Sequence, residues 1–460
     1  MLIKDEYDLI IVGAGILGCA AAVAFGKQER NVLLIERDLN EPDRIVGELL
    51  QPGGVIALEK LGLAECLENI DSISCHGYVV FRDGQYVQIP YPDRSDGQPG
   101  RGRSFHHGRF VMNLRKAAAA ESNVTIYEGI ANEVILCPIT DRAIGVSCSK
   151  KGESEVTINF FAPLTIIADG CFSKFRKEFI PKQVTVKSNF VGFVMTDSQL
   201  PYQNYGHVAL GKISPILMYQ ISTEHARVLV DVPGKLPSNG TGALKKYLEE
   251  VVLPDIPKSL QTKFYEALKT ERLRSMPNSF LPPSTNVNEG LILLGDAMNM
   301  RHPLTGGGMT VAFNDVVTLS ELLHPSQIPD FSDTGLILSK MQTFHWRRKE
   351  YCSVINILAQ ALYTLFSAND ENLRVLREGC FEYFLLGGRC ISDPCGLLSG
   401  LRPKPMILIG HFFAVAVYSI YCFFAQSSIL SIPQNIIKSF MVLYTACLVI
   451  LPLLWTECQP

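Results

Sequence analysis

Three glycines near the start of the chain have the spacing that binds the phosphates of a dinucleotide. An aliphatic strand expected at residues 9–12 leads into Gly13-Ala14-Gly15-Ile16-Leu17-Gly18, followed by an alanine-rich helix at 19–25 and a second strand at 31–35. Glycines in this pattern permit a tight turn, close approach of backbone to pyrophosphate and packing of helix on strand. Glu36 ends the second strand, where a carboxylate can accept from ribose hydroxyls. The pattern favours a bound dinucleotide over a purely structural turn.

A second candidate is the segment 291–309, LILLGDAMNMRHPLTGGGM. A buried strand expected at 291–294 ends in Gly295-Asp296, which places a carboxylate at the carboxyl edge of a sheet. Gly306-Gly307-Gly308 precede a helix expected at 309–323, so bare N–H groups and a helix N-terminus can face a flat or anionic ligand. Taken alone, these residues suit ordinary turn chemistry equally well. The choice depends on whether other segments agree.

Other side chains are weaker candidates. A third aliphatic strand, expected at 164–168, ends in Asp169-Gly170. Gln51 stands before two glycines and can hydrogen-bond the edge of a ring, and Tyr78 lies in a short alternating strand. A capped loop and a half-buried core tyrosine explain these two residues at least as well. His106-His107 has no third ligand at useful spacing, so no metal site is expected.

The composition excludes several classes of protein. The chain has 460 residues, of which 47% are hydrophobic, so it can bury one large domain or two. Its net charge of −3 argues against a nucleic-acid partner. The 13 cysteines are odd in number and scattered, which indicates reduced, mostly buried thiols in a protein whose bulk lies in the cytosol.

The elements between the candidate motifs form two groups. Strand-like segments recur through residue 167, and a β-rich region at 188–233 suggests an antiparallel sheet that forms the wall of a second domain. Short helices are expected at 55–61, 111–120 and 244–252, with Arg115 on the polar face of the second. Beyond residue 309 the chain reads as helical, including 336–368 and 370–384. The expected class is therefore α/β with a helical C-terminal part.

Two apolar segments stand near the C-terminus. Residues 406–425 and 439–455 contain no charge, and each approaches the ~20 apolar residues that cross a bilayer. A transmembrane hairpin joined by 426–438 is one interpretation, and helices lying partly in one leaflet are another. A buried core hairpin is less favoured. The first strand begins within ten residues of Met1, so we expect these segments to carry any membrane attachment.

The three strand ends together resemble those of FAD-binding monooxygenases of the aromatic-hydroxylase type. Longer blocks are similar to the squalene epoxidase (squalene monooxygenase) family: residues 36–48, 50–54, 105–110, 295–309, 356–363 and 408–416. The resemblance implies a Rossmann-type FAD-binding domain with an inserted β-sheet substrate domain and a C-terminal helical membrane-associated region. We expect the domains at 1–76, 103–187 and 272–335 for FAD, 77–102 and 188–271 for substrate, 336–405 for a helical cap and 406–460 for membrane-associated helices.

The resemblance implies a function as well. Family members epoxidise squalene to (S)-2,3-oxidosqualene in sterol biosynthesis with FAD, O₂ and electrons from NADPH, delivered by NADPH-cytochrome P450 reductase. The sequence fits, because it has one dinucleotide fingerprint and no second one for NADPH. Attachment to membrane lipid at the cytosolic face of the endoplasmic reticulum, monotopic through the C-terminal helices, is also implied. Alternatives are a flavin-dependent hydroxylase or reductase of another polyprenyl lipid, and a non-enzymatic lipid-binding escort.

The resemblance also assigns roles to residues. Tyr78 paired with Gln51 is expected to orient the flavin and the active site. The expected cofactor contacts are Gly13, Gly15, Ile16, Leu17, Gly18, Glu36, Arg37, Arg44, Leu49, Arg115, Ala131, Asp296, Gly307, Gly308 and Met309. A C30 hydrocarbon offers no hydrogen bonds, so its pocket recognises shape alone. The expected substrate wall is Phe366, Phe381, Phe384, Pro394 and His411.

Overall fold

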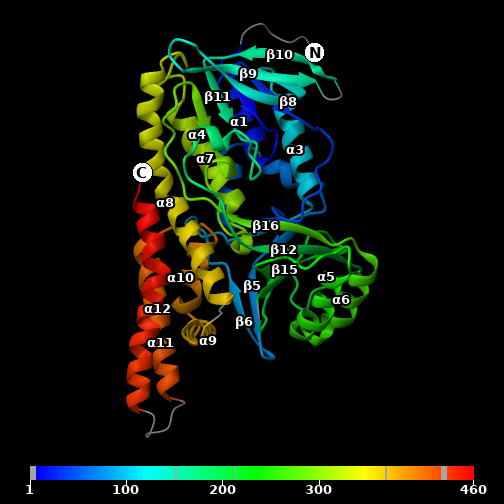
Figure 1. The fold of residues 1–460 in the computed structure, drawn as a ribbon, viewed down its shortest axis with the longest axis vertical. Helices are drawn as coiled ribbons and strands as arrows, with labels where there is room; N and C mark the ends of the chain where they lie inside the picture. The colour runs from blue at the N-terminus through cyan, green and yellow to red at the C-terminus, as the bar shows by residue number, and fades with distance from the viewer. Residues whose placement is uncertain (1–6, 151–152, 213, 368–369, 426–431, 460) are drawn as a thin grey trace.

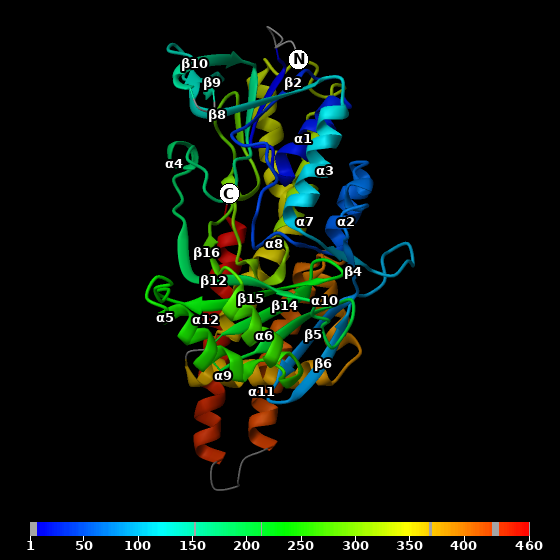
Figure 2. The same cartoon turned by 90° about the vertical axis from the view of Figure 1, so that its right-hand side faces the viewer.

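The protein is built from two seven-stranded sheets and a column of helices that runs beside both (Figure 1). The computed structural model describes residues 7–150, 153–212, 214–367, 370–425 and 432–459. The first sheet lies at one end of the molecule, and two apolar helices extend past the second sheet at the other end (Figures 1 and 2). This arrangement confirms the predicted class, an α/β Rossmann-type domain with a second sheet and a helical C-terminal region.

The first sheet has the strand order β10-β9-β8-β2-β1-β11-β17. Its strands are β1 (Leu9–Val12), β2 (Val32–Glu36), β8 (Val124–Leu136), β9 (Ala143–Lys150), β10 (Glu153–Phe161), β11 (Leu164–Ile167) and β17 (Leu291–Leu293). Strands β8, β2, β1, β11 and β17 are parallel, and β9 and β10 extend the sheet antiparallel. The central strands are aliphatic and buried. Because they run parallel, their carboxyl ends share one edge of the sheet, where ligand-binding turns gather.

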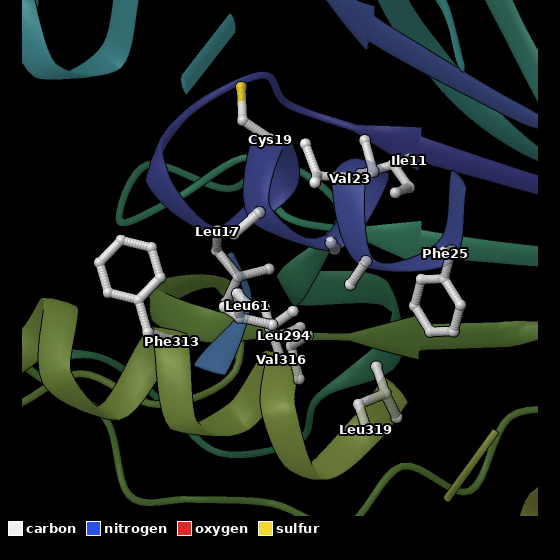
Figure 3. Packing of buried hydrophobic residues seen from close by; sticks show 14 of the residues in the cluster. Ile11, Leu17, Cys19, Val23, Phe25, Leu61, Leu294, Phe313, Val316 and Leu319 are labelled. Atoms are coloured by element: carbon white, nitrogen blue, oxygen red, sulfur yellow. The ribbon is translucent and has the colours of Figure 1, made fainter. Parts of the chain in front are cut away.

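Three helices cover one face of this sheet: α1 (Ile16–Gly26), α3 (His107–Ala120) and α7 (Gly308–Leu322). Figure 3 shows Leu17 of α1 extending toward Leu294, which follows β17, and toward Val316 of α7. Each fully buried Leu or Val contributes roughly 1.5–3 kcal/mol by leaving water. This packing fixes the N-termini of α1 and α7 beside the same sheet edge.

The second sheet has the order β16-β12-β15-β14-β13-β5-β6. Its strands are β5 (Gly77–Arg82), β6 (Gln85–Pro90), β12 (Thr185–Thr196), β13 (Tyr205–Leu210), β14 (Pro215–Gln220), β15 (His225–Pro233) and β16 (Arg274–Phe280). One face packs against α5 (Ala243–Tyr247), η2 (Leu248–Val252), η3 (Leu253–Asp255) and α6 (Lys258–Thr270). The other face contributes to an apolar cluster with the C-terminal helices. The helix expected at 244–252 is thus α5 continued by the π-helix η2.

Strand β16 changes one expected domain boundary. Its residues fall within 272–335, the segment assigned from sequence to the FAD-binding domain, yet β16 pairs with β12 of the second sheet. A strand that supplies one edge of a sheet shares the hydrogen bonds and core of that sheet. We therefore propose that the substrate domain extends through residue 280.

Short elements join the two sheets. They are the three-stranded sheet of β3 (Leu49–Leu50), β4 (Ile73–Cys75) and β7 (Gly102–Ser104), with α2 (Pro52–Lys60), η1 (Ala64–Leu67), α4 (Arg176–Phe179), η4 (Gly295–Ala297) and η5 (Pro303–Thr305). We expected α2 to begin at residue 55, but it begins at Pro52, because proline suits the first turn of a helix. A Cβ on Gly53 would lie 2.7 Å from the Gly400 carbonyl oxygen, so this helix start packs against the helical region.

The helical column contains α8 (Thr334–Phe366), α9 (Glu371–Leu385), α10 (Arg389–Leu398), α11 (Pro405–Ala425) and α12 (Ile432–Cys458). Helix α12 begins seven residues before the apolar segment expected at 439–455, because its polar first turns continue the same helix. Residues 426–431 of the expected connection lie outside the described residues. By length and composition, α11 and α12 could each cross a membrane.

A buried ion pair connects the second sheet to the segment that precedes β3. Glu48, just before β3, accepts two hydrogen bonds of 2.8 Å from the guanidinium of Arg227 on β15, and Tyr219 donates a third at 3.3 Å. Burial raises the pKa of Glu48, while the Arg227 charge opposes that rise. The bidentate geometry satisfies both groups, so each depends on the other for its burial.

Replacing Arg227 with Met should leave Glu48 buried without its cation. Losing one partner of such a pair costs about 3–5 kcal/mol. We therefore expect the free energy of unfolding, measured by urea denaturation, to fall by that amount. The control is Arg272→Met, at an exposed position nearby. Equal stability of the two variants would show that Glu48 and Arg227 are not coupled in solution.

Candidate cofactor and active site

A cavity of about 750 Å³ lies where the carboxyl edge of the first sheet meets the second sheet. Residues from the glycine fingerprint, from β2, from the 295–309 loop and from the second sheet all line it. Fourteen predicted site residues line it: Gly13, Gly15, Ile16, Leu17, Glu36, Arg37, Arg44, Leu49, Tyr78, Arg115, Ala131, Asp296, Gly308 and Met309. The fold thus brings together side chains that are nearly 300 residues apart in sequence.

The fingerprint turn is closed by contacts that only glycine allows. Gly13 has φ of +105°, and a Cβ there would lie 2.5 Å from the carbonyl oxygen of Ala168. A Cβ on Gly18 would lie 1.8 Å from the Gly13 carbonyl oxygen, so Gly18 permits packing and does not line the cavity. Gly15 has nothing within 4 Å of that position, which leaves its backbone open to a ligand.

Arg115 of α3 holds this turn in place by hydrogen bonds. Its guanidinium donates to the Ala14 carbonyl at 2.9 Å and to the Asn40 carbonyl at 3.0 Å, and it lies 3.6 Å from the Glu36 carboxylate. Glu36 accepts from the Ala14 N–H at 2.8 Å. The expected polar face of the helix is therefore buried against the fingerprint, where the arginine fixes both the turn and the acid that ends β2.

Arg176, which the sequence analysis did not single out, ties two predicted ligand loops together. Its guanidinium donates to the carbonyls of Gly170 and Cys171 after β11, and to those of Asp296 and Ala297 after β17. These bonds hold the Asp296 loop while its carboxylate stays exposed to the cavity. The signal was an arginine six residues after Asp-Gly, which is too common a pattern to predict such a role.

The three glycines before α7 have three different roles. Gly306 takes φ of +61° beside the amide of Gln51, and Gly308 has nothing within 4 Å of its Cβ position. A Cβ on Gly307 would meet Ile355 of α8 at 2.4 Å, and this residue does not line the cavity. Gly308 and Met309 therefore present the start of α7 to a ligand, and Gly307 lets α8 approach.

Gln51 is the centre of a buried hydrogen-bond group. Its amide nitrogen donates to the Tyr78 hydroxyl and, at 2.8 Å, to the Thr305 carbonyl, while its oxygen accepts from Tyr91 at 2.7 Å. Burial raises the pKa of Tyr78, so its hydroxyl stays neutral at physiological pH. Tyr78 lines the cavity and Gln51 does not. Tyr91, which follows β6, was not among the predicted site residues, because its partner Gln51 lies 40 residues earlier in the sequence, and it is buried.

The five predicted substrate residues do not line this cavity. Phe366, Phe381 and Phe384 belong to the apolar cluster between the second sheet and the C-terminal helices. His411 of α11 contacts the Tyr383 hydroxyl at 2.8 Å and Asp393 at 3.3 Å, and Pro394 lies within α10. The apolar residues at the cavity wall come instead from the second sheet and the glycine loop: Val208, Leu217, Tyr219, Leu229, Met276 and Leu304.

The two adjacent histidines serve structural contacts. His107 shares a hydrogen bond of 2.9 Å with the Gly47 carbonyl, and burial lowers its pKa to about 4. His106 lies 3.2 Å from His225 of β15. Across the part of the chain that the structure describes, no group of His, Cys, Asp or Glu has the arrangement of a metal site.

These polar groups fit FAD. Open backbone at Gly15 and Gly308, the Glu36 and Asp296 carboxylates and the N-termini of α1 and α7 lie along one elongated cavity. The buried Asp169 atom Oδ1 has no hydrogen-bond partner. A dinucleotide provides the hydroxyls and phosphates that such groups bind.

Comparisons with known proteins agree with this geometry. The family model described as squalene epoxidase matches residues 161–437, and that of glucose inhibited division protein A matches residues 8–187. The chain is 52% identical to squalene epoxidase erg1 of Aspergillus fumigatus, over 98% of this chain and 94% of that protein. It is 48% identical to squalene monooxygenase of Mus musculus, over 98% of this chain and 78% of that one.

The chain belongs to the squalene epoxidase family. Solved structures share the fold at lower identity. p-Nitrophenol 4-monooxygenase PnpA of Pseudomonas putida superposes with a TM-score of 0.69 at 16% identity, over 87% of this chain and 99% of that one. PqsL of Pseudomonas aeruginosa, titled a probable FAD-dependent monooxygenase, gives 0.65 at 18% identity, over 79% of this chain and 97% of that one. Membership of the squalene epoxidase family disfavours a hydroxylase of another polyprenyl lipid and a non-enzymatic escort.

Asp296→Ala should weaken FAD binding at least about tenfold, because a charge-assisted hydrogen bond contributes roughly 1.5–3 kcal/mol. The measurement is the visible flavin absorbance after gel filtration, together with titration of FAD into the apoprotein. Glu266→Ala, at an exposed position on α6, is the control and should retain the cofactor. A fully yellow Asp296→Ala protein would contradict the assignment.

Proposed function

We propose that this chain is an FAD-dependent monooxygenase that epoxidises squalene to (S)-2,3-oxidosqualene in sterol biosynthesis. The observation that carries the proposal is the match to squalene epoxidases over 98% of the chain. One oxygen atom of O₂ enters the terminal alkene and the other leaves as water, with two electrons from NADPH. Bound FAD supplies the transfer of these electrons to oxygen.

The groups described above would hold the cofactor. Gly13, Gly15 and α1 would bind the pyrophosphate, Glu36 and Arg37 the adenosine ribose, and Asp296 the ribitol. Gly308 and Met309 at the start of α7 would lie at the ring, where helix N–H groups would stabilise negative charge. Arg44, Leu49 and Ala131 complete the cavity wall around the cofactor.

Tyr78 and Gln51 orient the reacting groups. Gln51 donates to Tyr78, and Thr305 and Tyr91 fix its amide, so the Tyr78 hydroxyl proton remains free to point into the cavity. A neutral, hydrogen-bonded tyrosine at this place acts by positioning and not as a base. The apolar wall that includes Leu217, Leu229 and Leu304 excludes water from the reaction.

Squalene reaches this wall from the helical side. The apolar cluster that contains Phe366, Phe381 and Phe384 lies between the second sheet and α11 and α12. These side chains, with Pro394 and His411, form the outer part of the hydrocarbon path. Contact of Phe384 and its neighbours with the end of squalene would give recognition by shape, as an alkene without polar groups requires.

Tyr78→Phe should lower turnover about tenfold or more while FAD stays bound, because the hydroxyl acts in positioning and not in holding the cofactor. Oxidosqualene formation and flavin content are both measured. Tyr86→Phe, an exposed tyrosine on β6, is the matched control. Unchanged turnover of Tyr78→Phe would remove Tyr78 from the mechanism.

We propose that α11 and α12 attach the protein to one leaflet of the endoplasmic reticulum membrane, on its cytosolic face. NADPH-cytochrome P450 reductase then delivers the electrons at the same surface. Four residues on one face of α11 are buried, the last of them Ser419, which packs against Gly379 of α9, and the six residues beyond it to Ala425 span roughly 9 Å at 1.5 Å per residue. That length is far below the ~30 Å of a hydrocarbon core, which supports monotopic attachment.

The exposed large apolar residues of α12 that precede Lys438 would enter that leaflet: Ile432, Ile436 and Ile437. Lys438 pairs with Glu371 at the start of α9, which lies across the base of the two helices (Figure 2). Charged side chains at this level suit the interface between lipid headgroups and acyl chains.

Ile437→Glu should weaken binding to phospholipid vesicles about tenfold, because it places a charge on the surface that enters lipid. Val287→Glu is the matched control, since Val287 and Ile437 are each 68% exposed and Val287 lies in the other half of the molecule. Co-sedimentation with vesicles measures the effect. Equal loss of binding in both variants would contradict the proposed attachment site.

A further inference from the structure

Arg301 is a buried cation in the wall of the cofactor cavity. It lies between Asp296 and Gly306 in the loop that precedes α7, and all three residues line the cavity. Its exposed fraction is 8%. A guanidinium so well removed from water requires partners for its five N–H donors and for its charge.

Its only hydrogen bonds within the described residues come from one nitrogen. Nη2 donates to the Asn299 carbonyl at 3.1 Å and to the Asn299 side-chain oxygen at 2.7 Å, while the buried Nε has no partner. The Asn299 amide is held in this orientation because its nitrogen donates to the Leu281 carbonyl at 2.8 Å. Asn299 therefore fixes the direction of Arg301 without neutralising it.

Two of the nearby carboxylates are paired with other cations. Asp315 of α7 lies 2.8 Å from Arg348, and Glu457 of α12 lies 2.9 Å from Lys349. Of the ion pairs found in the described part of the chain, none includes Arg301. Asp296, a third carboxylate near Arg301, also lines the cavity but forms no ion pair with it, so Arg301 has no carboxylate partner of its own in the described residues.

The side-chain oxygen of Asn299 also accepts hydrogen bonds from other donors, so it satisfies Arg301 only in part. It accepts from Arg348 at 3.0 Å and from Asn356 at 3.2 Å, in addition to Arg301. An amide oxygen has two lone pairs. Burial is the largest cause that lowers the pKa of Arg301, yet a guanidinium does not lose its proton in proteins. The charge therefore needs an anion, and the cavity is where one can lie.

We infer that Arg301 faces the flavin ring and stabilises the negative charge that the ring acquires on two-electron reduction. This inference rests on the proposed binding of FAD. The position of Arg301, between the loop of Asp296 and the glycines before α7, places its charge beside the ring and not beside the pyrophosphate site at α1. Opposite charge at short range favours the anionic form of a neighbouring group.

The test compares Arg301→Met and Arg301→Lys with the unmodified holoprotein, and Arg347→Met, an exposed arginine of α8, is the control. The readouts are the two-electron midpoint potential of bound FAD and the dissociation constant of sulfite, which adds to the ring as an anion. Arg301→Met should disfavour the reduced flavin about tenfold, which is a potential ~30 mV more negative for a two-electron couple. Sulfite should bind about tenfold more weakly, and Arg301→Lys should recover most of both effects.

An unchanged potential in Arg301→Met would overturn the inference, and so would weaker FAD binding with an unchanged potential, since Arg301 would then hold phosphate. A second measurement needs no variant: the reduced flavin of the unmodified protein should remain anionic at about pH 6 by its absorbance. A neutral reduced flavin there would also overturn the inference. Failure of the proposed function is distinguishable, because the unmodified protein would then lack FAD or form no oxidosqualene.

Discussion

The contact between the Gly13 turn and the end of β11 constrains the whole cofactor cavity. A Cβ on Gly13 would lie 2.5 Å from the Ala168 carbonyl oxygen, so the first fingerprint glycine and the Asp169 loop must meet backbone to backbone. Arg176 extends the constraint to the loop after β17, and Arg115 extends it to Glu36. Predicted cofactor-binding groups from three parts of the sequence are thereby held at one sheet edge by contacts within the protein.

Buried polar groups join this edge to the second sheet. The Glu48 pair with Arg227 and the hydrogen bonds of Gln51 each cross from a loop of the first domain to another part of the fold. Their partners are satisfied only in one relative placement of the two sheets. The apolar part of the cavity wall is therefore positioned by polar contacts behind it, because apolar packing alone tolerates small shifts.

The sequence predicts features that depend on local chemistry. Three features were expected where the structure has them: the strand at Leu9–Val12, the glycine turn and the loop of Asp296. Each is marked by residues close together in the sequence, an aliphatic strand followed by glycine or aspartate. Tyr91 and Arg176 were not predicted, since their partners are far away in sequence. The resemblance led us to expect Phe381 and His411 in the substrate wall, but neither lines the cavity. Their spacing along a helix does not tell how that helix lies relative to a cavity.

The Glu457 carboxylate near the end of α12 accepts from Asn356 at 2.8 Å, and Asn356 shares the Asn299 oxygen with Arg301. The contacts beneath the loop of Asn299 thus include Glu457, which the ribosome adds more than 400 residues after the glycine fingerprint. A nascent chain can form the first sheet early, but it cannot complete these contacts until α12 has been synthesised and has returned to the body. The contacts that support the loop of Asn299 are therefore complete only once the apolar helices have been synthesised.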